Sequence, residues 1–182
     1  MISTVPVALP IQLGVAELSA PVRSVLSFAV VLLAGVAFLR WRGPMVDRAV
    51  DRTVDGSPVA VVYGVVAFVL VVVIAAYGLT QVARLGASGT VLRTVGELVG
   101  GAALVALSAF GYLVLGVYLT EVEGARRPLL GALVGAVLSA LPWLVLSTLP
   151  ALAAWALLSA VGLGSPTRHY IHGDRTVATE AG

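Results

Sequence analysis

Long apolar blocks, separated by short charged segments, set the pattern of this chain. The blocks lie at residues 22–40, 58–82, 95–119 and 128–164. A helix that spans a bilayer needs about 20 apolar residues, each of which adds about 1.5 Å. In hydrocarbon every backbone polar group must be hydrogen-bonded within its own segment. Each block is therefore predicted to be helical, even the second one, which is rich in β-branched valine.

The last apolar block is too long for one crossing. Pro142 and Pro150 lie inside it, and Ser147–Pro150 is its only polar interruption. We therefore expect two short helices, at about 129–146 and 149–163, that fold back on each other as a hairpin. A hairpin that enters the membrane and returns without fully crossing it would leave both of its ends on one side, as a hairpin that crosses twice does. The prolines also fit a broken helix that lines a cavity, as in transporters.

The predicted fold class is therefore all-α: a polytopic transmembrane helical bundle in which the last two of about five membrane segments form the short hairpin. Residues 1–164 are expected to form one domain, and residues 165–182 a polar tail. The five expected segments lie at about 22–40, 58–82, 95–119, 129–146 and 149–163.

Composition supports a membrane protein and excludes several function classes. Hydrophobic residues make up 59% of the chain and charged residues only 11%, whereas soluble domains carry roughly 25% charged residues. The absence of cysteine excludes disulfides, thiolate metal sites and cysteine nucleophiles. The net charge of +2 is too small to indicate nucleic-acid binding. The bilayer is therefore the one partner that the composition predicts.

The arginines predict an orientation. With five crossings and the N-terminus outside, eight of the eleven basic residues fall on the cytoplasmic side, as the positive-inside rule requires. With four crossings, six arginines would be cytoplasmic and five external, so the arginine distribution favours the hairpin. The expected location is the cell membrane, with a cytoplasmic C-terminus. The three external arginines are Arg23, Arg84 and Arg93.

The connector at 44–55 is predicted to be an amphipathic helix. Val46, Val50 and Val54 recur every four residues, and charged side chains occupy the other faces. This segment is either a helix that lies on a surface or docks a partner, or an ordinary solvated connector between two crossings. Its charged residues are Asp47, Arg48, Asp51, Arg52 and Asp55.

Glu97 is the only acid that falls within a predicted crossing. An acid inside a membrane is a candidate for proton or cation transport. Near a helix end, however, Glu97 can reach the interface and pair with Arg93, four residues earlier. His169, His172 and Asp174 in the tail are too few, and too loosely held, to predict a metal site.

Catalysis is not expected. Both histidines lie outside the predicted spans, and no nucleophile elbow, P-loop, dinucleotide motif or zinc-protease motif is present. No cofactor or metal is predicted for the same reason.

Two pairs of glycines have the spacing of helix-packing motifs. Gly96 and Gly100 lie four residues apart in the third crossing, and Gly131 and Gly135 open the last block. Small residues at this spacing let helix backbones approach closely in lipid. We expect the two faces to pack against each other or against another subunit, as in a homo-oligomer or a complex with a membrane-protein partner.

Two stretches of the chain resemble a known arrangement. They are FLRWRGPMVDRAVDRTVDGSP, which precedes an apolar crossing, and the ending RRPLLGALVGAVLSALPWLV…LSAVGLGSPTR. Together they are similar to the C-terminal membrane region of some bactofilin-like (polymer-forming cytoskeletal) proteins of archaea and bacteria. The glycine-punctuated β-repeats that polymerise in those proteins are missing from this chain, so the resemblance implies a membrane anchor or scaffold without filament formation. The cysteine-free, all-arginine composition also resembles that of haloarchaeal proteins.

The sequence therefore leads to two hypotheses about function. The first is a small membrane scaffold, anchor or subunit that associates through its glycine faces. The alternative is a channel or transporter component that uses Glu97 and the proline-containing hairpin.

Overall fold

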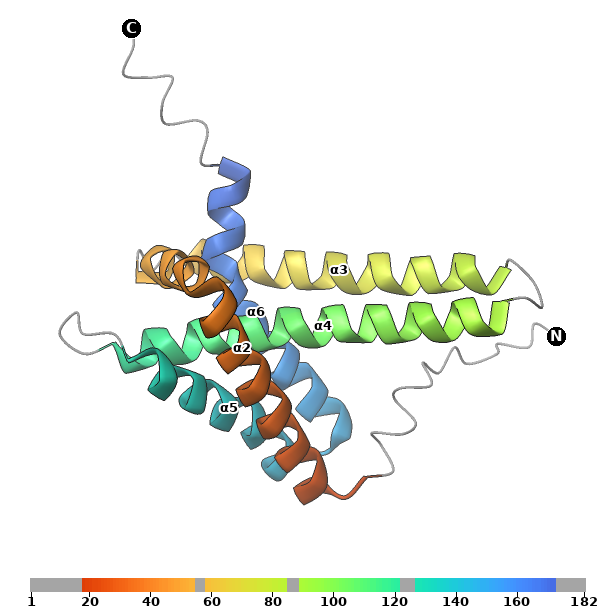
Figure 1. Ribbon diagram of the computed structural model, residues 1–182, viewed down its shortest axis with the longest axis horizontal. Helices are drawn as coiled ribbons and strands as arrows, with labels where there is room; N and C mark the ends of the chain where they lie inside the picture. Colours follow the sequence, from red (N-terminus) through yellow and green to blue (C-terminus); the bar gives the residue numbers. More distant parts are fainter. Residues whose placement is uncertain (1–17, 55–57, 85–88, 122–126, 173–182) are drawn as a thin grey trace, which may run out of the picture.

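A computed structural model describes residues 18–54, 58–84, 89–121 and 127–172 (Figure 1). These residues form five helices and no strand, which confirms the all-helical fold class. The helices are α2 (Ala20–Val54), α3 (Pro58–Arg84), α4 (Gly89–Thr120), α5 (Pro128–Val145) and α6 (Thr148–His172).

Three stretches of these helices are long and apolar enough to cross a membrane: Ala20–Asp51, Thr94–Thr120 and Pro128–Val145. The apolar parts of the other two helices are shorter, at Val62–Gly78 and Thr148–Gly164. The described chain is thus compatible with membrane insertion, with three candidate spans rather than five.

Helices α3 and α4 form a long pair, and the other helices cross this pair near one end, around Gly64 of α3 and Gly111 and Gly116 of α4. This packed region is called the crossing below, as distinct from the predicted membrane crossings. Figure 1 shows α3 and α4 side by side, with α2, α5 and α6 packed across only part of their length. The core therefore lies where the five helices meet. Two neighbouring clusters of buried side chains fill it, one around Leu113 and Val114 of α4 and one around Tyr112 of the same helix.

Helix α2 contains both the first predicted crossing and the connector that follows it. Arg42 has non-helical dihedral angles (φ −138°, ψ 32°), so the helix bends there. Pro44 explains the bend, because proline has no N–H to donate and its ring restricts the preceding residues. Beyond the bend Val46 and Val50 are fully buried, against Val114, Val117 and their neighbours of the first cluster. The apolar face of the connector is thus part of the core.

The predicted hairpin is present as α5 and α6. Helix α5 continues for three residues past Pro142 and ends at Val145; Leu146 is extended, and its N–H donates to the Pro142 carbonyl at 2.9 Å. Helix α6 then begins at Thr148, with Pro150 in its first turn, where a missing N–H costs little. It runs on to His172, well into the segment expected to be a polar tail, because extending an existing helix is far easier than nucleating one.

Candidate functional site

The closest helix contacts depend on glycine. A Cβ added to Gly116 of α4 would overlap the Gly131 carbonyl oxygen of α5, and one added to Gly135 would overlap the carbonyl oxygen of Tyr112. The backbones of α4 and α5 therefore touch with no room for a side chain between them. Such contact is how helices gain van der Waals energy where lipid supplies no hydrophobic drive.

Helix α6 packs against α3 and α4 in the same way. A Cβ on Gly64 of α3 would overlap the Ala160 carbonyl oxygen, and a Cβ on Gly111 of α4 would overlap that of Ser159. Gly162 of α6 in turn faces the Gly111 carbonyl oxygen. The glycines of the crossing region thus join four of the five described helices.

The structure does not bring the two predicted glycine pairs together. Gly131 and Gly135 lie against Val117, Gly116 and Tyr112, at the C-terminal end of α4. Gly100 lies on the part of α4 outside the crossing, and a Cβ placed there would meet no atom within 4 Å. Gly96 is half-buried one turn earlier.

A small polar network lies inside the crossing, between α2, α5 and α6. The Ser27 hydroxyl donates to the Ser139 carbonyl at 3.0 Å and accepts a hydrogen bond from Trp155 Nε1 at 3.1 Å. The Ser139 hydroxyl donates to the Ala136 carbonyl at 2.7 Å. The Ser27 hydroxyl thus uses its one donor and one of its two acceptor lone pairs. These hydrogen bonds therefore fix how three helices are placed against each other.

Tyr112 extends this network to α4. Its hydroxyl donates to the Trp155 carbonyl at 2.8 Å, and the two rings lie 5.8 Å apart between centroids. On α2, the Ser24 hydroxyl donates to the Ala140 carbonyl at 3.2 Å. The network therefore holds α2, α4, α5 and α6 together through neutral hydrogen bonds.

Arg23 forms a separate cluster at the first turn of α2. Its Nη1 donates to the Thr148 hydroxyl at 2.6 Å, and its guanidinium carbon lies 5.7 Å from the centroid of the Trp143 ring. The cluster therefore joins the start of α2 to the end of α5 and the start of α6. Among the described residues, three buried side-chain atoms lack a hydrogen-bond partner: Arg23 Nε, Trp143 Nε1 and Ser108 Oγ.

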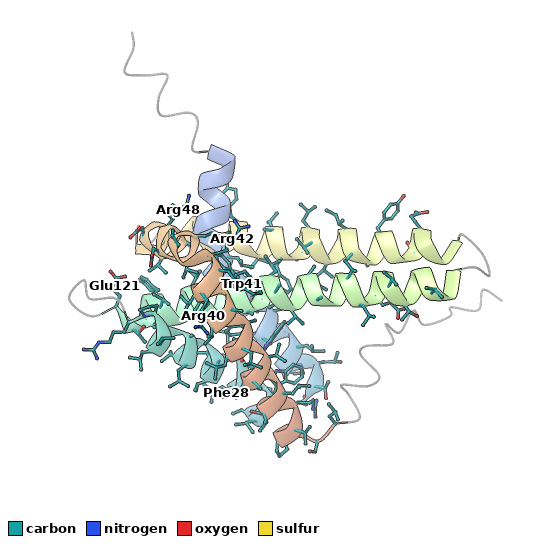
Figure 2. All side chains as sticks on the ribbon, in the orientation of Figure 1. Phe28, Arg40, Trp41, Arg42, Arg48 and Glu121 are labelled. Atoms are coloured by element: carbon teal, nitrogen blue, oxygen red, sulfur yellow. The ribbon has the colours of Figure 1, made fainter. Side chains whose placement is uncertain are left out.

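The charged residues of the connector lie on the outer face of α2. Asp47, Arg48 and Asp51 are exposed, and Arg48 Nε donates to the Pro44 carbonyl at 2.9 Å. Figure 2 shows Arg40, Trp41 and Arg42 where α2 bends, with Arg48 beyond the bend. The other two predicted positions, Asp55 and the side chain of Arg52, lie outside the described residues.

Glu97 is half-buried on α4, far from the proline-containing hairpin. It precedes Ser108, whose carbonyl accepts a hydrogen bond from Ser159 of α6, by eleven residues, which is about 17 Å along a helix at about 1.5 Å per residue. The side chain of its predicted partner, Arg93, is outside the described part of the structure. No group of three or more histidine, cysteine or acidic residues that could hold a metal ion occurs in the described residues. His169 and His172 belong to α6, and Asp174 lies beyond the described chain.

The sequence did contain signals for the contacts that were not predicted. On α5, small residues repeat every four positions along two adjacent lines, and all of them are buried: Gly131, Gly135, Ser139, Ala132, Ala136 and Ala140. A double line of this kind predicts a buried helix face more strongly than one glycine pair does. The Arg23 cluster had no such signal, because its three side chains are distant in sequence.

The chain matches no protein-family model, no curated protein and no solved structure. The fold therefore defines only a class: an all-helical protein with three apolar helices able to span a membrane.

Proposed function

We propose that this protein is a multi-pass integral membrane protein that acts as a scaffold, anchor or subunit of a membrane assembly and catalyses no reaction. One observation carries the proposal: the chain uses its polar side chains and glycines for internal packing at the crossing, and leaves a glycine-containing face of α4 open. The resemblance to the membrane region of bactofilin-like proteins agrees with an anchor role.

The proposed orientation has the N-terminus outside and the C-terminus in the cytoplasm. The end of α2, the start of α3, the end of α4 and the start of α5 lie together at one end of the molecule (Figure 1). Arg48, in the last part of α2, and Arg127, which precedes α5, lie at this end, and Arg40 and Arg42 lie at the bend of α2. This distribution suits a cytoplasmic face.

The proposed association surface is the outer part of α4. Leu98 is 67% exposed and Val99 is 64% exposed, and Ala102 and Ala103 are exposed beside them. Because no atom of the described residues lies within 4 Å of a Cβ at Gly100, another helix backbone can approach there. We propose that a second copy of this chain, or a helix of another membrane protein, packs on this face.

Replacement of Gly100 by leucine tests this surface. The matched control is Gly78→Leu, because Gly78 on α3 also has open space around its Cβ position. Gly100→Leu is expected to lower self-association in liposomes about tenfold or more, as measured by energy transfer between labelled chains diluted with lipid. Gly78→Leu is expected to leave it unchanged. Equal association of wild-type protein and both variants would contradict the surface.

Single cysteines offer an independent measurement, because the native chain has none. Cysteine at Val99 is expected to form disulfide-linked dimers in membranes, whereas cysteine at Val66, exposed on α3, is not. If neither cross-links at any protein density, self-association is wrong and a different membrane-protein partner must be sought.

The transport alternative has less support from the structure, because Glu97 lies about 17 Å along α4 from the contact with α6 at Ser108. Glu97→Gln remains its direct test. A proton- or cation-dependent flux in liposomes that disappears in this variant would favour transport over a scaffold.

A further inference from the structure

The cluster of Arg23, Trp143 and Thr148 has more hydrogen-bond donors than acceptors. A guanidinium has five N–H donors and no acceptor, and among the described residues that of Arg23 donates only to Thr148. Arg23 Nε is buried without a partner. Trp143 is only 6% exposed, and its Nε1, another donor that cannot accept, is also unpartnered.

No negative charge balances this arginine in the described residues. Its two side-chain partners are the Thr148 hydroxyl and the face of the Trp143 ring, both of them neutral. A half-buried cation with only neutral partners is costly, as is each buried donor without an acceptor. The missing negative charge and the missing acceptors are both supplied by the same kind of group, an anion with several acceptor oxygens.

The position of the cluster indicates which anion it meets. Residues 24–39 after Arg23 carry no charge, so Arg23 marks the end of an apolar span. The α5–α6 turn ends beside it, with Thr148 at the start of α6. An arginine and a tryptophan at the end of membrane helices lie at the depth of the lipid headgroups. There the abundant anion is phosphate.

The donors themselves suit phosphate. Arg23 Nε and Trp143 Nε1 are both buried without an acceptor and can only donate, and one phosphate carries several acceptor oxygens. Arginine binds phosphate through two parallel N–H groups, which a lysine cannot copy.

We propose that Arg23 and Trp143 bind a phosphate group, with the Arg23–Thr148 hydrogen bond opening to admit it. Two sources share this chemistry, the phosphate of a lipid headgroup and free inorganic phosphate. The guanidinium and Trp143 Nε1 donate to phosphate oxygens, and the Thr148 hydroxyl, released from Arg23, donates to a third. This site is independent of the association surface on α4.

The test is thermal unfolding of the full chain in dodecyl maltoside, a detergent without phosphate, titrated with three additives. Dioleoyl phosphatidylglycerol presents the lipid phosphate, dioleoylglycerol has the same acyl chains without it, and sodium phosphate supplies the free anion. A ligand that binds only the folded state raises the unfolding midpoint as its concentration rises. Phosphatidylglycerol is expected to raise it and dioleoylglycerol is not. An equal rise with sodium phosphate that is lost in Arg23→Gln identifies the free anion as a sufficient ligand, because phosphate also stabilises folded proteins by exclusion from their surface. No rise with it, or a rise that Arg23→Gln keeps, identifies the lipid.

Variants separate binding from folding. Arg23→Gln is expected to weaken the lipid response about tenfold or more, because charged hydrogen bonds are lost. Trp143→Phe keeps an aromatic ring beneath the guanidinium but removes the N–H. It is expected to weaken the response about fivefold while leaving the lipid-free midpoint unchanged or higher, since a buried unpartnered donor is gone. Arg40→Gln, an exposed arginine at the other end of the same span, is the matched control and should respond as wild type.

Three results would overturn the proposal. A rise with dioleoylglycerol equal to that with phosphatidylglycerol would mean that only the acyl chains bind. A wild-type response of Arg23→Gln to phosphatidylglycerol would mean that the guanidinium does not bind the phosphate. The third result concerns Glu17, the acid nearest to Arg23 in the sequence. If Glu17→Gln lowers the lipid-free midpoint as much as Arg23→Gln does, and the protein does not respond to phosphate, the chain's own carboxylate is the acceptor. If Arg23→Gln does not fold, Trp143→Phe alone decides, because its expected binding loss comes without a stability loss.

Discussion

The two ends of the α3–α4 hairpin differ in how they meet their surroundings. At the crossing, glycines 64, 111 and 116 sit against the backbones of α5 and α6, and a polar network links Ser27 with Trp155 and Tyr112. Along the outer part, Gly78 and Gly100 have open space around them, and large apolar side chains such as Leu98 are exposed. The same residue types thus serve two purposes. In the crossing they hold the chain together, and in the outer part they are exposed.

This difference shows why glycine spacing alone does not locate a helix contact. A glycine lets another helix backbone approach closely, but packing energy is gained only where such a backbone faces the glycine. Gly116 has such a backbone in α5, whereas no other described residue provides one at Gly100. The contrast can be tested by making similar substitutions in the two regions.

The largest effect is expected for Gly135→Leu. A side chain at Gly135 would run into the Tyr112 carbonyl oxygen and force α4 and α5 apart, which disrupts the core as well as the contact. We expect a loss of more than about 3 kcal/mol in the free energy of unfolding or no folded protein at all, judged from the upper end of the range for overpacked cores. Denaturant titration in mixed micelles, followed by circular dichroism, measures it.

Gly78→Leu is the control for that experiment, because the added side chain points into open space on α3. Its free energy of unfolding should stay within about 0.5 kcal/mol of the wild-type value, as for other substitutions at exposed positions. Equal losses in both variants would show that the two regions do not differ in packing.

An intermediate effect is expected beyond the bend of α2. Val50 is fully buried and Val66 is 58% exposed, although both belong to valine-rich helices. Val50→Ala is expected to cost about 2 kcal/mol of unfolding free energy, because it removes buried methyl groups and leaves a cavity. Val66→Ala is expected to cost less than about 0.5 kcal/mol.

The same titration in mixed micelles compares the two valine variants. If Val50→Ala costs no more than Val66→Ala, the second limb of α2 does not pack on α4, and the connector lies on a surface as one of the two sequence hypotheses held.

Long apolar blocks were enough to predict most of the fold. In hydrocarbon a segment has no option but to hydrogen-bond to itself, so block boundaries translate directly into helices. The break at Leu146–Ser147 followed from two prolines and a short polar interruption. The length of α6 was not predicted, since nothing in Ser165–His172 marks a helix except that one already precedes it.

The sequence was a poorer guide to what the helices touch. The spacing of Val46 and Val50 indicated an apolar face, but two surroundings, a core and a lipid surface, satisfy the same pattern. Only the bend at Arg42 directs that face onto α4. The approach of Arg23 to Trp143 and Thr148 likewise depends on how three helices cross, which no local pattern records.

The smallest expected effect is a gain of stability in the outer part of α4, whereas the same substitution at the crossing is expected to destabilise the protein. Gly100→Ala places a methyl group in open space on a helix, and alanine loses less conformational entropy on folding than glycine does. Its free energy of unfolding is expected to rise by about 0.5 kcal/mol in the dilute, monomeric protein. Gly111→Ala makes the same chemical change where the methyl group would overlap the Ser159 carbonyl oxygen, so it is expected to lose about 2 kcal/mol. Denaturant titrations of the two variants, run at one protein concentration, give both values. A destabilised Gly100→Ala monomer would mean that another part of the chain covers α4 there, and the outer face would then be closed to a partner.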